Sequence, residues 1–176
     1  ISEFAKKYKV IALDSRCHGK SDCPPQYLTY EQMADDVYEL LNHLNIDSAL
    51  VWGHSDGAVI GLLIAIHHSE KIQKLLASGA NLRPDNTAID PVLFQLLDVM
   101  SSQAKKDSVR SKQFRLLVDQ PNIPVTDLEK IKSSVMIMSG DRDAIRNKHT
   151  LEIFEHIPKA LLCILPGTTH FVYLDR

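Results

Sequence analysis

The sequence contains few of the residues that mark specialised classes of protein. It has only three cysteines, Cys17, Cys23 and Cys163, an odd number at unrelated spacings. This argues against a disulfide framework and favours a reducing compartment, so we expect a cytoplasmic protein. Histidine, cysteine, aspartate and glutamate nowhere form a group with the spacing of metal ligands. We therefore expect no metal and no other cofactor.

Long apolar runs and blocks of like charge are also lacking. No apolar run approaches the ~20 residues of a membrane-spanning helix, so we expect no transmembrane segment. The chain has 20 Lys+Arg and 22 Asp+Glu, mixed along its length, for a formal net charge of -2. No basic run is interleaved with aromatic residues, and we expect no nucleic-acid partner. With 176 residues, 44% of them hydrophobic, the chain has enough material for one core.

Short apolar runs carry the secondary-structure signal, because nearly unbroken runs are typical of strands buried on both faces. Helical patterns fall between these runs. Thr29 and Gln32 resemble a capping box ahead of one helix, and two more are expected at Asp56–His68 and Asn147–His156. The alternation predicts an α/β fold with a mostly parallel sheet, flanking helices and right-handed crossovers. The expected strands are Tyr8–Leu13, Ala49–Trp52, Ile72–Ala77, Val135–Met138 and Ala160–Leu165.

Residues 82–134 contain no clear strand, and a structureless loop of that length is improbable in a compact domain. Pro91–Met100 and Ser108–Val118 carry apolar residues at helical spacing. We expect a small helical cap here, inserted into a core formed by residues 1–81 and 135–176. Part of the stretch is basic, which a solvated helix face explains better than attraction of an anionic substrate. The basic residues are Lys105, Lys106, Arg110, Lys112 and Arg115.

The sequence Gly-His-Ser-Asp-Gly at residues 53–57 lies where an apolar strand turns into a helix. A Gly-x-Ser-x-Gly turn in that context predicts a nucleophile elbow, in which the serine has a strained backbone conformation. Glycine is expected at Gly53 and Gly57 because a side chain at either position would clash where strand and helix pass. Ser55 is then exposed above a helix N-terminus, and His54 is expected to line the site.

A serine hydroxyl needs a base to take its proton and a carboxylate to orient that base. Asp143 and His170 each lie just past the C-terminal end of a predicted strand, as Ser55 does. In an open parallel sheet these ends share one edge, where sites assemble. The sequence therefore predicts a Ser-His-Asp site, with Asp141 as an alternative to Asp143.

Three further motifs accompany the elbow. One precedes it, DSRCHGKS at 14–21, and two come after it, GDRD at 140–143 and PGTTHF at 166–171. They resemble the D-x-R-G-H-G-x-S turn, the acid turn and the histidine loop of the α/β-hydrolase superfamily, with Cys17 where glycine is usual. The order Ser, Asp, His also matches that family. Together with the elbow, these motifs extend the resemblance over nearly the whole sequence.

The resemblance implies a capped, esterase-like serine hydrolase acting on a small-molecule acyl substrate. Ser55 would form the acyl-enzyme, His170 would act as base, and Asp143, the second aspartate of its turn, would orient His170. The backbone N–H of Asp56 would donate to the oxyanion. The substrate class is open among esters, thioesters, amides, lactones and activated carbon–carbon bonds.

Several alternatives remain open at this stage. The same fold can serve as a ligand receptor or signalling protein, or as an acyltransferase. The oligomeric state is not predicted. The family has strands and a second oxyanion donor before the region where this chain starts, and a closing helix after it, so we expect a fragment of a longer protein. His18 is expected to fix a turn near the site; further histidines are expected at the surface, at His43, His67, His68 and His156.

Overall fold

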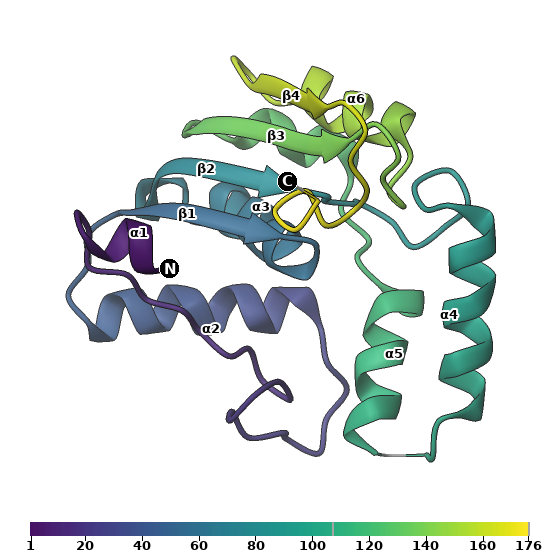
Figure 1. Cartoon of the computed structure of the whole chain (residues 1–176). Helices are drawn as coiled ribbons and strands as arrows, with labels where there is room; N and C mark the ends of the chain where they lie inside the picture. The colour runs from purple at the N-terminus through teal and green to yellow at the C-terminus, as the bar shows by residue number, and fades with distance from the viewer. Residues whose placement is uncertain (107, 176) are drawn as a thin grey trace.

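The structure is a computed structural model that describes residues 1–106 and 108–175. Within these residues, four parallel strands form one sheet in the order β1-β2-β3-β4 (Figure 1). The parallel sheet and four of the five predicted strands are therefore confirmed. The strands are β1 (Ala49–His54), β2 (Ile72–Ser78), β3 (Ser134–Gly140) and β4 (Leu161–Leu165).

Helices connect the strands, as the alternating pattern predicts for a parallel sheet. The helix expected at 147–156 has the predicted bounds, and the one expected at 56–68 ends one residue earlier. The helices are α1 (Ser2–Ala5), α2 (Tyr30–His43), α3 (Asp56–His67), α4 (Pro91–Gln103), α5 (Val109–Asp119) and α6 (Asn147–His156), with short 3-10 turns η1 (Ser69–Lys71) and η2 (Val125–Lys130).

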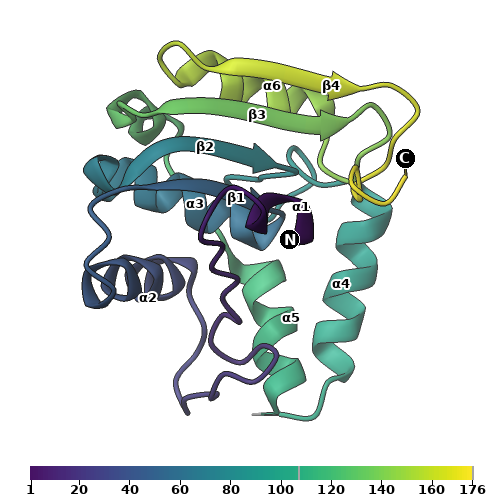
Figure 2. The same cartoon turned by 60° about the vertical axis from the view of Figure 1, so that its left-hand side comes forward.

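The helix α3 lies at the centre of the core. Every residue from Ala58 to Ile66 is buried, as expected for a helix that is apolar on all sides. It packs on β1 and β2, and α2 covers it from outside (Figure 2). Thr29 is the N-cap of α2, and its hydroxyl oxygen accepts the backbone N–H of Gln32 at 3.1 Å, so this half of the predicted capping box is confirmed. The Gln32 side-chain oxygen accepts from Arg16 at 3.3 Å and does not bond back to Thr29 in the described part of the chain.

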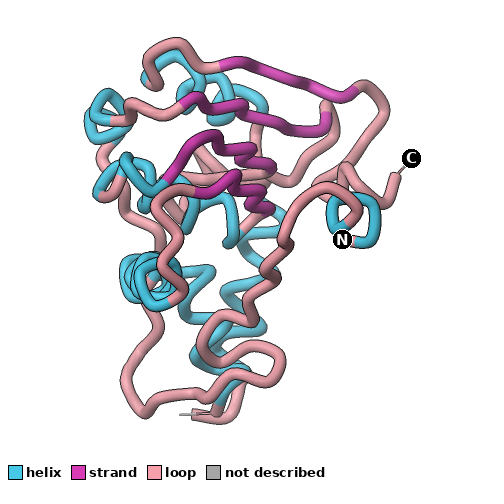
Figure 3. Tube along the Cα trace, turned by 90° about the vertical axis from the view of Figure 1, so that its left-hand side faces the viewer, coloured by secondary structure: helices cyan, strands magenta, loops and turns pink. Residues whose placement is uncertain are grey.

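The segment Tyr8–Leu13 is not a strand, and that prediction is wrong. Figure 3 shows the chain between the short N-terminal helix and α2 as loop. From Lys9 to Leu13, no backbone hydrogen bond is formed to any described residue. A strand requires a hydrogen-bonded neighbour, and β1, the edge strand of the described sheet, pairs only with β2. The apolar pattern thus identifies a strand-like sequence without supplying its partner.

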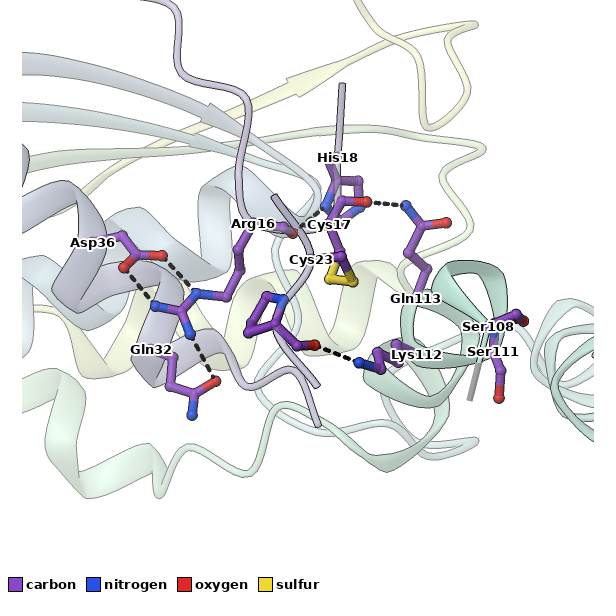
Figure 4. Close-up of a disulfide and its surroundings, with 11 residues drawn as sticks. Arg16, Cys17, His18, Cys23, Gln32, Asp36, Ser108, Ser111, Lys112 and Gln113 are labelled. Atoms are coloured by element: carbon purple, nitrogen blue, oxygen red, sulfur yellow. Dashed lines mark hydrogen bonds and ion pairs between the residues drawn. A yellow bond between two sulfur atoms is a disulfide. The ribbon is translucent and has the colours of Figure 1, made fainter. Parts of the chain in front are cut away.

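Cys17 and Cys23 form a disulfide, although the number and spacing of the cysteines argued against a disulfide framework (Figure 4). A tight turn brings them together, with the N–H of Cys17 donating to the carbonyl of Asp22 at 3.0 Å. Cys17 has a φ of 62°, in the left-handed region that favours glycine, the residue usual here in the resembling motif. The cysteine-based argument for a reducing compartment therefore fails. Cys163 is free and half-buried in β4.

The helices α4 and α5 pack against each other and stand at the carboxyl ends of the strands (Figures 1 and 2). The α5 helix rests on the disulfide loop: the side-chain amide of Gln113 donates to the carbonyl of Cys17 at 2.8 Å, and the Lys112 ammonium donates to the carbonyl of Pro24 (Figure 4). Lys112 is only 8% exposed. The expected solvated basic face is therefore wrong at Lys112, which ties the helix to the loop.

None of the helices in the described part of the chain combines the length and the apolar character needed to cross a bilayer.

Candidate active site

Ser55 occupies the turn between β1 and α3 in a conformation that few non-glycine residues adopt. Its φ is 53° and its ψ is -118°. Backbone strain of this size persists only where the surroundings fix it. Here the N–H of Ser55 donates to the carbonyl of Ser78 at 2.8 Å, and its carbonyl accepts the N–H groups of Ala58 and Val59. The strand β2 and the first turn of α3 thus hold the serine at the sheet edge.

The two glycines of the turn differ in what they do. A Cβ built on Gly53 would overlap the backbone of Gly57 and Ala58, so the predicted steric requirement holds there. A Cβ built on Gly57 would have no heavy atom within 4 Å. The expectation of a clash at Gly57 is therefore wrong: its backbone lies against Gly53, but a Cβ at Gly57 would point into open space.

The glycine difference gives a matched pair of variants. Gly53→Ala is expected to destabilise the fold by about 1–3 kcal/mol, because backbone must move to admit the Cβ, and to lower any activity of Ser55 about 100-fold by displacing it. Gly57→Ala adds a good helix former to the first turn of α3 and is expected to match the parent in both respects. Thermal melts and ester hydrolysis measure both effects, and equal losses in the two variants would contradict the geometry.

Asp143 and His170 lie side by side at the same edge. The Nδ1–H of His170 donates to Oδ1 of Asp143 at 2.7 Å, and the Asp143 side chain is 0% exposed while that of His170 is 18% exposed. Asp143 also accepts the N–H of Ile145 at 2.8 Å and the hydroxyl of Ser139 at 3.1 Å. Because a carboxylate only accepts, His170 carries its proton on Nδ1 and leaves Nε2 as the basic nitrogen.

The electrostatics of Asp143 favour a permanent negative charge. Burial acts to raise the pKa of Asp143, but the hydrogen bond and charge of His170, with the Ile145 and Ser139 donors, outweigh it. The pKa of Asp143 is therefore lowered. Its carboxylate is ionised at neutral pH and is suited to stabilise a positively charged His170.

Asp141 has a different position. It is exposed, and its Oδ1 accepts the backbone N–H of Thr168 at 3.2 Å, so it fixes the loop that carries His170. The N–H of Gly167 is the largest of the contacts that lower the pKa of Asp141. The histidine contacts Asp143 and not Asp141. This geometry favours Asp143 as the orienting acid.

The side chains of Ser55 and His170 form no hydrogen bond with each other in the described part of the chain, and the two residues are linked through His54 and Gly79. The His170 ring lies against Gly79, where a built Cβ would be 2.7 Å from Cε1 of the ring. Gly79 directly follows Ser78, the residue that holds the backbone of Ser55. Catalytic hydrogen bonds are often long before substrate binds. The structure therefore brings the predicted base and nucleophile to one place, with the hydroxyl–imidazole contact still open.

His54 lines the same place, next to the serine. Its ring centroid is 4.8 Å from that of His170 and 4.9 Å from that of Tyr173. Burial lowers the pKa of His54, and the charge of His170 lowers it further, so this ring is neutral at pH 7. The ring contributes a packed, uncharged wall beside His170.

The oxyanion donor expected from sequence is the first N–H of α3. The N–H of Asp56 belongs to a helix start, where backbone donors have no partner within the helix. The carboxylate of Asp56 accepts the hydroxyl of Tyr30 at 2.7 Å, a contact that sequence reasoning missed. The two residues are 26 apart in the chain, and nothing local in the sequence links them.

A shallow, open cavity of about 300 Å³ lies between the start of α4 and the two loops that carry Asp143 and His170. Ser55 is not among its lining residues. Its lining residues are Asp90, Leu93, Arg142, Asp143, Ala144, Thr169, His170 and Phe171.

A second hollow, of about 340 Å³, lies beside the disulfide loop. Two of its charged side chains pair with each other, since Arg16 forms an ion pair with Asp36 at 2.6 Å. It contains none of the predicted site residues.

The remaining histidines have structural surroundings. His68 stacks on Tyr38 with ring centroids 3.7 Å apart, and His18 bonds the carbonyl of Arg16 at 3.0 Å, in keeping with a turn-fixing role. Among residues 1–106 and 108–175, no group of three or more histidine, cysteine, aspartate or glutamate side chains is placed to hold a metal ion.

His149 is the histidine that sequence reasoning missed. It is 1% exposed, accepts the N–H of Leu82 at 2.9 Å and bonds Glu152 at 2.8 Å, which in turn binds Arg83. Burial lowers the pKa of His149, so it is a neutral bridge. It joins α6 to the segment that leads into α4. The spacing of His149 and Glu152 on one helix was visible, but their partners near residue 82 were not.

Comparison with known proteins points to one family. A family model described as alpha/beta hydrolase fold matches residues 1–116. The Haemophilus influenzae protein named "Putative esterase/lipase" is 24% identical over 205 residues, covering 98% of this chain and 71% of that protein. The 3-oxoadipate enol-lactonase 2 of Acinetobacter baylyi is 37% identical over 79 residues, which are 45% of this chain and 30% of the enol-lactonase.

Solved structures agree on the architecture. The 2-hydroxy-6-oxo-6-phenylhexa-2,4-dienoate hydrolase of a Rhodococcus strain superposes with a TM-score of 0.79 at 19% identity, covering 100% of this chain and 78% of that one. At that identity the similarity is one of fold.

Proposed function

The chain belongs to the α/β-hydrolase family, and from that premise we propose that it is a serine hydrolase that cleaves carboxylic esters or related acyl compounds. The observation that carries the proposal is the strained backbone of Ser55 at the same sheet edge as the hydrogen-bonded Asp143–His170 pair. Ser55 is half-buried and not fully exposed as expected, and strain at such a serine is stable only if the fold is built to present it. A base and a buried carboxylate at that edge are the groups that such a serine needs.

The proposed reaction proceeds through an acyl-enzyme. His170 Nε2 takes the proton of the Ser55 hydroxyl as its oxygen attacks the substrate carbonyl carbon, and Asp143 stabilises the imidazolium that forms. His170 then returns the proton to the leaving alcohol. Water, activated by the same nitrogen, attacks the acyl-enzyme, releases the acid and restores Ser55. Each proton that leaves an oxygen is returned within the cycle, so no cofactor is required.

To lower the activation free energy, the site must stabilise the negative charge that develops on the oxygen of the tetrahedral intermediate. The N–H of Asp56 is the donor available in this chain, at the positive end of α3. One donor of this kind contributes about 3 kcal/mol to the stabilisation of a transition state.

We propose that α4 and α5, within residues 82–134, are the cap. The start of α4 forms one wall of the cavity at His170, through Asp90 and Leu93. An antiparallel bridge between Ile89 and Ile145 fixes this wall to the loop of Asp143. Binding part of the substrate between α4 and the His170 loop is consistent with esters and lactones, the substrates suggested by the names of the two relatives.

Burst kinetics test the proposed function directly. Short-chain p-nitrophenyl esters are expected to release p-nitrophenol in a burst equal to the concentration of active sites, followed by steady turnover, because p-nitrophenol leaves in the acylation step and, with so good a leaving group, the slower deacylation lets the acyl-enzyme accumulate. If an alcohol is added and the acyl group is transferred to it in preference to water, the protein is an acyltransferase. Absence of both burst and turnover across the series would overturn the proposal and favour a receptor on this fold.

A further inference from the structure

The hydrogen bond between Tyr30 and Asp56 is buried beside the proposed nucleophile. Tyr30, the first residue of α2, is 1% exposed, and its hydroxyl donates to Oδ1 of Asp56 at 2.7 Å. Burial and then the charge of Asp56 raise the pKa of Tyr30, so the hydroxyl keeps its proton and acts as the donor. Asp56 immediately follows Ser55 and is the first residue of α3.

The Asp56 carboxylate would destabilise the oxyanion of the proposed reaction unless the side chain is held pointing away from it. The backbone N–H of Asp56 is the proposed donor to the oxyanion, and the side chain of the same residue carries a negative charge. The Asp56 carboxylate and the oxyanion carry the same charge and repel each other, and this repulsion increases as the site loses water. The preorganised donors of an oxyanion hole work only if no anion competes for the same place.

The Tyr30 hydroxyl lies on the side of α3 that faces α2. The Tyr30 ring is part of the hydrophobic core formed with Ala58, Val59 and Leu62. A carboxylate bonded to that hydroxyl is drawn toward the interface of the two helices.

Tyr30 is itself held by two neighbouring elements. Thr29 begins α2 with its side-chain cap, and the backbone N–H of Tyr30 donates to the side-chain oxygen of Gln120 at 3.2 Å. Gln120 is the C-cap of α5. The hydroxyl therefore has a fixed position relative to both the core and the end of the proposed cap.

We propose that Tyr30 is a positioning residue for the oxyanion site: its hydroxyl holds the Asp56 carboxylate away from the developing negative charge and fixes the first turn of α3. The inference rests on the proposed function, since it assigns a role within the same site. Tyr30 touches no reacting atom. It acts through Asp56.

A double-mutant cycle tests this role. In the parent protein, Tyr30→Phe frees the carboxylate and is expected to lower kcat for a neutral p-nitrophenyl ester about 10-fold or more while KM changes little. In an Asp56→Asn background the side chain has no charge to control, and adding Tyr30→Phe is expected to change kcat less than about 2-fold. Rates are normalised to active sites counted by the p-nitrophenol burst. Tyr38→Phe on the same helix is the control.

A purely structural tyrosine gives a different pattern. It would lower the melting temperature and the number of active sites equally in both backgrounds, with kcat per active site at the parent value, and that result would overturn the proposal. Asp56→Glu supplies a second measurement if Tyr30→Phe does not fold. It retains the charge but displaces the carboxylate from Tyr30, so it is expected to lose more kcat than Asp56→Asn. The reverse order would contradict the proposed role.

Failure of the inference and failure of the proposed function are distinguishable. If the parent protein shows no burst and no turnover, the proposed function is wrong. If it shows both and Tyr30→Phe matches it in kcat per active site, the function stands and the role of Tyr30 is wrong.

Discussion

Ser55→Ala is expected to abolish covalent labelling by a fluorophosphonate probe and to lower ester hydrolysis by about 10⁶-fold, to the level supported by binding alone. The probe reacts with a serine whose proton is removed by a base and whose oxygen is presented to the phosphorus. Ser55 meets the second condition through its strained turn. Mass spectrometry of the labelled parent protein is expected to place the adduct on the peptide containing Ser55.

The serine substitution needs a control for general damage. Ser102→Ala, on the exposed part of α4, removes a hydroxyl that bonds only the carbonyl of Val99 at 2.8 Å. That variant is expected to label and turn over like the parent protein. Labelling at a serine other than Ser55, or undiminished hydrolysis by Ser55→Ala with a parent-like melting curve, would refute the assignment.

The parts of the fold that local sequence determines are those that could be predicted. Asn147–His156 matches because an apolar face and a following proline define a helix within ten residues. The four strands match because each is a short apolar run between helical patterns. Tyr8–Leu13 has the same kind of run and forms no strand. Its failure shows that a run indicates the capacity to pair, and the partner decides the outcome.

Features that depend on distant contacts could not be predicted. Tyr30 and Asp56 are 26 residues apart, and His149 bonds Leu82 across 67 residues. The Cys17–Cys23 disulfide is local, but its detection required the turn geometry and not the residue count. Gly57 illustrates the opposite error. A motif rule suggests a steric reason for a glycine where the backbone leaves room for a side chain.

The candidate site lies between these cases. Motif order selected Ser55, Asp143 and His170 from sequence, and the structure supports the choice of Asp143 through a contact that no motif supplies, its 2.7 Å bond to His170. The role of Asp141 as a loop anchor became visible only with the Thr168 N–H in place. Loop geometry decides which of two nearby aspartates faces a histidine. The four-residue motif at 140–143 does not specify that geometry.

The contribution of Asp143 to the stability of the fold depends on pH. The pKa of Asp143 is lowered in the folded state, so its ionised form contributes stability that is present above the unfolded pKa of about 4 and is lost as the pH falls through the lowered value. Across neutral pH the carboxylate stays ionised. Titration of Asp143 therefore does not limit activity there.

Asp143→Asn is expected to lower kcat by about 10⁴-fold, because an amide at this position favours the wrong tautomer of His170 and cannot stabilise the imidazolium. Asn has the size of Asp. With its NH₂ group in place of the oxygen that faces His170, its remaining oxygen can keep the bond from the Ser139 hydroxyl, but the bond from the Ile145 N–H to that first oxygen is lost. The melting temperature is therefore expected to fall by a few degrees. Asp141→Asn is the matched control, since it sits two residues earlier on the same loop and is exposed. Its expected loss of kcat is small. Steady-state kinetics with p-nitrophenyl esters, normalised to Ser55 labelling, separate the two variants. If Asp141→Asn loses the rate and Asp143→Asn retains it, the acid has been assigned to the wrong residue, and the 2.7 Å contact with His170 is structural.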